Sequence, residues 1–399
     1  MEIRRLSKTS YRETRLKQRF GFDNEYLWGT PGDLGLAAKG AKFGDSSEFN
    51  VQADWRISPD SLLIAGYSRS TGDYTLHSMF GNNIYKNKST VDGFYLQDEA
   101  RFGLWSFLIG GRQDNIKMYD DTKNGVELNP SSSVSVFNPR LGAQYQWNPA
   151  TSLYASAGTA YVPATNAARF IDGDVPDPSL KPEESVSYEI GYEASNPSAL
   201  KSALFHTNFR NKINRVEVAP AQYQNQNIDR VEVDGLEFGW KGRLGDAWSP
   251  FMNYSYTDSR IKADSTNSSN VDTRMPQTSV HKLNLGLIYA PGNDWSASVM
   301  GTYRSDQYVR QWYCPTNNTD TYECHLNGYF TADAKVARTF SPFASKDKWS
   351  AWLAINNLAG KKYRQYFPFE YSDGRTLTIG VDGALSVIVP GCGMCHFAW

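Results

Sequence analysis

Segments of about ten residues in which apolar and polar side chains alternate recur along almost the whole chain of 399 residues. In VSYEIGYEA (186–194), Val186, Tyr188, Ile190 and Tyr192 share one face, and serine, glycine and glutamate share the other. A period of two indicates a β-strand whose two faces meet different surroundings. A tilted strand of about this length can cross a lipid bilayer.

The alternation predicts strands in most of the chain. The clearest segments are 94–102, 105–112, 152–161, 186–194, 236–244, 282–290, 296–304, 329–340, 349–358 and 375–385. We expect about fifteen strands after residue 46 and one or two more near 10–40.

The connections between these segments alternate in length. Short turns fall at 58–60, 103–104, 148–150, 195–199, 245–246, 291–294 and 341–347. Long polar loops are expected at 73–90, 118–136, 162–184, 211–229, 260–279, 306–326 and 359–374. A β-sandwich gives no reason for such a regular pattern, whereas an outer-membrane barrel has short turns on one rim and long loops on the other.

A membrane barrel also explains the two faces of each strand. Every backbone amide and carbonyl needs a partner in lipid, so an all-β membrane protein closes into a barrel. We therefore expect Val186, Ile190 and Tyr192 to face lipid, and Glu189 and Glu193 to face the lumen.

The apolar phase changes once along the chain. Val231 and Val233 have one parity, whereas Leu236 and Phe238 have the other. We expect a β-bulge at 234–235, between the two pairs.

Composition suits a membrane β-barrel and also a secreted β-sandwich or propeller. Aromatic residues make up 14% of the chain, the net charge is −1, and no run of 18 apolar residues predicts a transmembrane helix. Nothing in the charge suggests nucleic-acid binding. The first twenty residues are basic and have no apolar centre, so they do not read as a signal peptide.

Five stretches resemble a known family in order and spacing. They are GFYLQDEARFGLWSFLIGGRQD, NPRLGAQYQWNPATSLYASAGTAYVPATNAARF, DPSLKPEESVSYEIGYE, NIDRVEVDGLEFGW and INNLAGKKYRQY. Together they resemble the C-terminal barrel of TonB-dependent outer-membrane receptors over about residues 50–385. The residues that match are Pro139, Arg140, Tyr161, Pro163, Pro178, Leu180, Lys181, Pro182, Glu183, Ser185, Tyr188, Glu189, Gly191, Asn357, Leu358 and Tyr363.

The resemblance implies a 22-stranded barrel that is plugged by an N-terminal globular domain. It also implies external loops that bind a scarce ligand and a plug that contacts TonB, which transmits energy from the inner membrane. This chain resembles roughly the last sixteen strands, and no counterpart of the plug is visible in it. The fold class expected is therefore all-β, an antiparallel transmembrane barrel portion of about 15–17 strands. We divide the chain into 1–45 (N-terminal strands or loop), 46–385 (barrel) and 386–399 (atypical tail).

One long loop concentrates arginine and aromatic residues that suit an anionic chelate. The candidate ligand-binding residues are Arg304, Tyr308, Arg310, Trp312 and Tyr313. Arginine can pair with anionic oxygens, and aromatic rings can add cation–π contacts. The alternative is that part of this set belongs to the aromatic girdle at the membrane interface.

The same loop contains Cys314 and Cys324, for which we expect a disulfide in an oxidising compartment. Closing so short a loop still contributes about 2–3 kcal/mol. The alternative is two free thiols.

The tail contains Cys392, Cys395 and His396 in a CxxCH pattern that also occurs at c-type haem attachment sites. A bare short motif is only a hypothesis, and we expect no cofactor. Haem-uptake receptors of the family carry a histidine between two of these motif stretches. Residues 162–184, which lie in the corresponding place, contain no histidine, and this disfavours haem as the transported ligand. No set of residues suggests an enzyme or a metal site.

We therefore expect an outer-membrane receptor portion that serves TonB-dependent uptake of a ferric siderophore or similar metal chelate. Its expected partners are lipid, the chelate and, through a plug, the TonB complex. The alternative is a passive porin-like or structural barrel. We also expect that residues 1–399 alone do not perform regulated uptake.

Overall fold

The computed structural model describes residues 5–23, 36–77, 83–129, 131–163, 180–195, 198–219, 222–265, 268–310, 323–341, 348–364, 371–383, 385–387 and 395–397. Over these ranges the fold is all-β apart from one 3-10 turn, η1 (Ser268–Asn270). None of the described helices is long and apolar enough to cross a membrane.

One sheet of 17 strands dominates the molecule. Its strands are β1 (Arg5–Asp23), β2 (Leu36–Ser58), β3 (Ser61–His77), β4 (Ile84–Phe102), β5 (Trp105–Lys123), β6 (Val126–Asn129), β7 (Ser132–Asn148), β8 (Thr151–Val162), β9 (Glu183–Ala194), β10 (Ala199–Ala219), β11 (Gln222–Lys241), β12 (Trp248–Ala263), β13 (His281–Tyr289), β14 (Trp295–Arg304), β17 (Tyr329–Phe340), β18 (Trp349–Asn356) and β19 (Thr376–Gly383). Two small hairpins stand apart from it, β15 (Gln307–Arg310) with β16 (Glu323–Leu326) and β20 (Leu385–Val387) with β21 (Cys395–Phe397).

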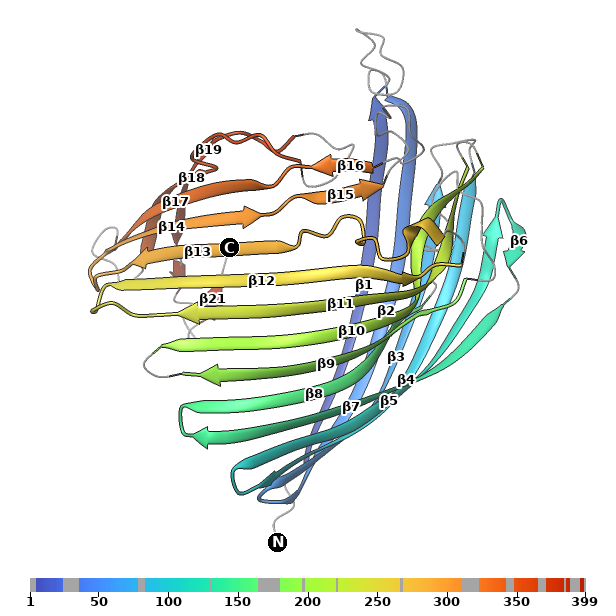
Figure 1. Ribbon diagram of the computed structural model, residues 1–399, viewed down its shortest axis with the longest axis horizontal. Helices are drawn as coiled ribbons and strands as arrows, with labels where there is room; N and C mark the ends of the chain where they lie inside the picture. The colour runs from blue at the N-terminus through green and yellow to red at the C-terminus, as the bar shows by residue number, and fades with distance from the viewer. Residues whose placement is uncertain are drawn as a thin grey trace.

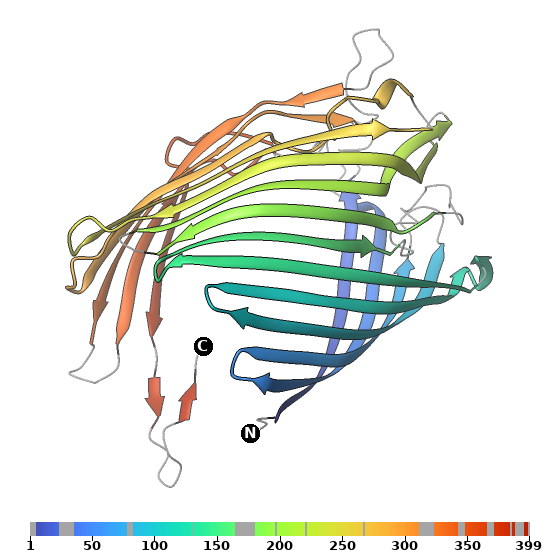
Figure 2. The same ribbon diagram turned by 60° about the horizontal axis from the view of Figure 1, so that its bottom comes forward.

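Neighbours in the sheet follow each other along the chain, and every pairing is antiparallel. The short β6 lies beside the end of β5, so β5 pairs with both β6 and β7, and the β15–β16 hairpin extends the connection from β14 to β17. The sheet curls around a central space (Figures 1 and 2). Over the described strands, β1 pairs only with β2 and β19 only with β18. The prediction of an antiparallel all-β barrel portion is confirmed, and the count of 17 lies within the expected range.

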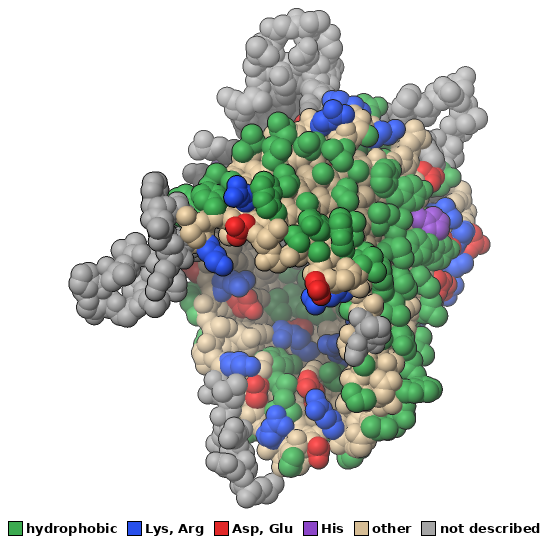
Figure 3. Space-filling view, turned by 90° about the vertical axis from the view of Figure 1, so that its left-hand side faces the viewer, with side chains coloured by type: hydrophobic (Ala, Val, Ile, Leu, Met, Phe, Trp, Pro, Cys, Tyr) green, Lys and Arg blue, Asp and Glu red, His purple; other side chains and the backbone are tan. Residues whose placement is uncertain are grey.

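Apolar side chains cover the outside of the curled sheet and charged ones gather in its hollow (Figure 3). On the outside, Leu96, Ile109, Leu141 and Ile190 are more than half exposed. Such exposure is unfavourable in water and expected in lipid. Along β9, Tyr188 and Ile190 lie on this outer surface, whereas Glu193 lines the inner cavity, as the alternation predicts.

The prediction of a β-bulge at 234–235 is wrong. Pairing of β11 with β10 and β12 is continuous there, and the irregularity in the pairing of β11 with β12 lies between Arg230 and Val231. Val231 and Val233 share the parity of the cavity-lining Glu237 and pack in a buried cluster around Ile261. Beyond the lipid belt the outer face meets water, so apolar residues move to the inner face without a change of register.

The chain after β12 returns along that strand and covers this cluster. Asp272 N–H donates to the carbonyl of Ile261 at 2.7 Å, and Met275 N–H donates to that of Ser259 at 2.9 Å. Met275 packs against the buried cluster. Apolar burial on the inner face therefore occurs at the end of the sheet that carries the long connections.

Three of the long loops expected from the sequence, 73–90, 118–136 and 211–229, are largely strands. β3 and β4 continue to His77 and from Ile84, and β10 and β11 are separated by two residues only. β5 and β6 are joined by Asn124 and Gly125, both with positive φ, as a two-residue hairpin requires. These strand ends lie beyond the alternating segments, where backbone pairing alone maintains them and no face must be apolar.

Candidate functional site

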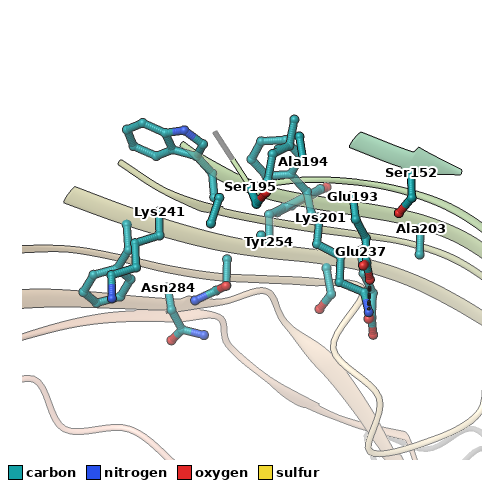
Figure 4. Close-up of a pocket in the computed structure, with 18 of the residues that line it drawn as sticks. Ser152, Glu193, Ala194, Ser195, Lys201, Ala203, Glu237, Lys241, Tyr254 and Asn284 are labelled. Carbon is teal, nitrogen blue, oxygen red and sulfur yellow. Dashed lines mark ion pairs between the residues drawn. The ribbon is translucent and has the colours of Figure 1, made fainter. Parts of the chain in front are cut away.

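The hollow of the sheet contains a cavity of about 1010 Å³, lined by residues of β7 to β14. Glu193, Lys201 and Glu237 extend into it from three neighbouring strands (Figure 4). Lys201 Nζ lies 2.9 Å from Glu193 Oε1. The inner wall is therefore polar and charged at the end of the barrel that carries the short turns.

Glu189, four residues before Glu193 on β9, is held by a tyrosine of the neighbouring strand β8. Tyr154 Oη donates a hydrogen bond of 2.7 Å to Glu189 Oε1. The Tyr154 ring lies over Gly191, and a Cβ at that position would overlap it. Glycine at 191 is required because it lets the tyrosine lie flat against the wall.

Glu183, at the start of β9, forms a clamp at the opposite end of the barrel. Its carboxylate accepts two hydrogen bonds from Lys212 Nζ, at 2.8 and 2.9 Å, and one from Ile213 N–H at 2.7 Å. The Glu183 side chain is only 10% exposed. The acidic residue of the LKPE motif thus fixes the entry to β9 against β10.

The residues before Glu183 are fixed by an amide that the motif does not contain. Lys181 N–H donates to Asn227 Oδ1 at 2.8 Å, and Asn227 Nδ2 donates to the Lys181 carbonyl at 3.0 Å. Asn227 Nδ2 also donates to the Asn211 carbonyl at 2.8 Å. Leu180 is buried. The long connection before β9 is therefore tied to the β10–β11 hairpin.

Asn357 organises the turn after β18. It has a positive φ of 53°, which asparagine tolerates better than most residues. Its side chain accepts from Lys361 N–H at 2.9 Å and donates to the Lys361 carbonyl at 2.8 Å. Leu358 N–H donates to Ala332 O on β17. Tyr363 then stacks on Tyr329, with ring centroids 3.9 Å apart.

Of the candidate ligand-binding residues, the structure brings Arg304 to the inner wall. Arg304 ends β14 and lines both the large cavity and a smaller one beside it. Tyr308 lies on the neighbouring β15 and is exposed. Trp312, Tyr313 and Cys314 lie outside the described residues, as do the side chains of Arg310 and Cys324. The expected disulfide therefore stays a prediction.

Some of the remaining motif residues lie on strands β7 to β9, and others lie just outside them. Arg140 on β7 lines two inner cavities. Tyr161 is opposite Glu184 in the register of β8 and β9, and Ser185 is opposite Ala160. Pro139 lies next to Arg140, and Pro163 and Pro182 lie outside their neighbouring strands, beyond β8 and before β9. Pro178 lies outside the described residues.

Three residues beside Arg304 were not identified from the sequence. Lys282 is its direct neighbour on β13, and Arg364 and Tyr329 line the same smaller cavity. Lys282 falls on the polar face of an alternating segment, which is the one signal that could have pointed to it. Their proximity depends on strand register and on the turn after β18, which sequence spacing does not reveal.

The family model for TonB dependent receptor-like β-barrels matches residues 4–358. The chain belongs to this family. Among relatives of this receptor family, it is 26% identical to the ferrioxamine B receptor of Salmonella typhimurium, over 70% of this chain and 38% of that protein. It is 28% identical to an uncharacterized TonB-dependent receptor of Haemophilus influenzae, over 71% of this chain and 81% of that protein.

The fold is similar to solved receptor structures. The ferripyoverdine receptor of the outer membrane of Pseudomonas aeruginosa aligns with a TM-score of 0.71 and 16% identity, over 94% of this chain and 54% of that one. The copper transporter OprC aligns with a TM-score of 0.69 and 17% identity, over 95% of this chain and 62% of that one. The chain thus spans only part of most receptors that it matches. The family and its relatives are transport receptors and not enzymes.

The chemistry that the wall offers is recognition. Within the described ranges, no group of three His, Cys, Asp or Glu side chains is placed to hold a metal ion. The inner wall instead presents hydrogen-bond donors, carboxylates and cations around a large open space. Such a surface can hold a polar ligand or another protein segment through hydrogen bonds and charge.

Proposed function

We propose that this chain forms part of the barrel wall of an outer-membrane receptor. The receptor takes up a ferric siderophore or a similar metal chelate by TonB-dependent active transport. The observation that carries the proposal is the two-faced wall. An apolar outer surface surrounds a polar cavity of about 1010 Å³, and a cluster of basic and tyrosine side chains lies at the end with the long connections.

Three further points support this proposal. The family match covers most of the chain. Relatives include a ferrioxamine B receptor and a probable siderophore receptor of Acinetobacter baumannii. The LKPE motif (180–183) and the NNL motif (356–358) fix the end of the barrel that carries the long connections, through Glu183 and Asn357. The connections therefore leave the sheet from rigid supports. A rigid support is what a selective loop-based binding site needs.

The test is growth under iron limitation on single iron sources. A strain deleted for the gene that encodes this chain is compared with its parent on ferric hydroxamates, catecholates and carboxylates. We expect the deletion to abolish growth on one of these chelates, complementation to restore it, and loss of TonB to mimic the deletion. Growth that is lost with the gene but unaffected by TonB would instead support a passive porin-like barrel.

A further inference from the structure

Two basic side chains lie directly opposite each other on the inner face of the sheet. Lys282 of β13 and Arg304 of β14 are register partners and line both the large and the smaller cavity. Like charges at directly opposed positions destabilise a sheet. The pair therefore costs stability in the free protein unless an anion lies nearby.

The protein supplies no carboxylate to either side chain over the residues that the structure describes. Neither Lys282 nor Arg304 has an ion pair or a side-chain hydrogen bond there. Elsewhere on the inner wall, Arg112 pairs with Asp114 at 2.8 Å and Lys201 pairs with Glu193 at 2.9 Å. The contrast indicates that the counter-charge at Lys282 and Arg304 comes from outside these strands.

The smaller cavity beside the pair is lined by basic and uncharged side chains. It has a volume of about 80 Å³, and none of its described lining residues is acidic. The lining comprises Lys282, Arg304 and Arg364 together with neutral polar and apolar residues, which are Gln277, Ser279, Ser305, Gln307, Asn327, Leu326 and Tyr329. Ser279 Oγ already donates to Gln307 Oε1, and Ser305 Oγ donates to the Asp306 carbonyl, so the cations are the groups that bind an anionic oxygen.

An aromatic contact holds Arg364, the third basic residue of the smaller cavity, in place. The Arg364 guanidinium lies 4.3 Å from the centroid of the Tyr371 ring. Tyr363, which precedes Arg364 in the chain, stacks on Tyr329, and Tyr329 is buried in the cavity wall. A cation fixed by ring contacts loses little freedom when a ligand binds, so the site is pre-organised.

We propose that Lys282, Arg304 and Arg364 form a subsite for an anionic oxygen group of the transported chelate, either a carboxylate or a catecholate. The inference rests on the proposed function and adds the charge class of its substrate. A space of 80 Å³ suits one such substituent. The body of a chelate needs a space of several hundred Å³, which the adjoining cavity of about 1010 Å³ provides.

The test measures chelate binding to outer-membrane vesicles from cells that express the receptor containing this chain. Three probes are used, namely ferric citrate, a ferric tris-catecholate and a neutral ferric trihydroxamate. The double variant Lys282→Gln, Arg304→Gln removes both charges and keeps polar side chains. Lys117→Gln is the matched control, because Lys117 is an exposed lysine of β5 that lines neither cavity.

For the anionic probe that the unaltered receptor binds, we expect the double variant to raise Kd about tenfold or more, since charge-assisted hydrogen bonds are lost. Lys117→Gln, outside both cavities, and Arg304→Lys, which keeps the charge, should leave Kd within about threefold of the unaltered receptor. The double variant should also unfold at a higher temperature than the unaltered receptor, because it removes like-charge repulsion. A merely structural role for the pair would instead lower that temperature.

The remaining outcomes overturn the inference. If the unaltered receptor binds and imports only the neutral chelate, or if the double variant weakens all probes equally, the subsite is wrong and the transport proposal stands. If the unaltered receptor binds none of the chelates and loss of the gene changes growth on none of them, the proposed function fails and the subsite fails with it.

Discussion

Single side chains fix the ends of the strands from which the long connections leave. Glu183 is the clearest case, because its nearly buried carboxylate accepts from the Lys212 ammonium and from a backbone N–H of the same strand. Removing one partner of such a pair leaves the other charge poorly solvated, which costs more than the pair contributes in net terms. The acid of the LKPE motif therefore has a structural reason to be acidic.

We predict that Glu183→Gln lowers receptor stability by about 1–3 kcal/mol, because Lys212 loses its counter-charge. The measurement is the temperature at which the folded, fast-migrating band disappears in electrophoresis of unboiled samples. Glu184→Gln is the matched control, since Glu184 is adjacent and exposed. Equal midpoints for the two variants would show that the clamp contributes nothing.

Pairs of strands hold the inner wall together by fitting an aromatic ring of one strand over a glycine of the next. Tyr154 crosses Gly191 and reaches Glu189. Gly142, on β7, has only ordinary contacts around the position of an added Cβ. The two glycines therefore differ in the space that they provide, although both lie within strands of the same sheet.

We predict that Gly191→Ala destabilises the barrel by about 1–3 kcal/mol, because the added methyl group displaces the Tyr154 ring. Gly142→Ala should change the unfolding temperature little. Adding Tyr154→Ser to Gly191→Ala should recover part of the loss. If Gly191→Ala is as harmless as Gly142→Ala, then the ring does not lie over this glycine in the membrane.

The alternation of each strand also predicts which residues meet lipid. In a background in which the four cysteines are replaced by serine, spin labels are attached at Ile190→Cys and at Glu193→Cys. We expect the label at 190 to be accessible to oxygen in the bilayer and the label at 193 to a water-soluble nickel complex. The reverse pattern would mean that the faces of β9 are assigned the wrong way round.

At the scale of the whole molecule, the described strands form a curled sheet with two edges. β1 and β19 each have a partner on one side only over the part of the chain that the structure describes. Unpaired backbone groups in lipid cost several kcal/mol each, and exposed strand edges promote association. Both edges therefore need partners in a working barrel.

We predict that residues 1–399, produced alone and directed to the outer membrane, accumulate as aggregated or degraded protein. The measurement is fractionation of cell membranes followed by the heat-dependent band shift that marks folded barrels. Folded protein in the outer membrane that imports chelate in an energy-dependent way would contradict this prediction.

The strands could be predicted from sequence wherever one face meets lipid, because that contact enforces a period of two. β17 was predicted to the residue, at 329–340. Beyond the lipid belt the same rule fails. The strand ends in 73–90 and 211–229 were expected to be loops, and the apolar phase at Val231 was misread as a bulge, because pairing there does not require an apolar outer face.

The candidate site was predicted only in part for a related reason. Arg304 could be identified because arginine and aromatic residues cluster around it in the sequence. Lys282 and Arg364 are distant along the chain and reach Arg304 through strand register and the turn at Asn357. Spacing in one strand carries no information about which residue of another strand lies opposite.

The most direct test of the account is the initial rate of ⁵⁵Fe uptake by iron-starved cells that express the receptor containing this chain, given the chelate that supports their growth. The account predicts saturable uptake that stops when the proton-motive force is collapsed and is absent without TonB. Uptake that rises linearly with chelate concentration and is unaffected by either treatment would contradict it.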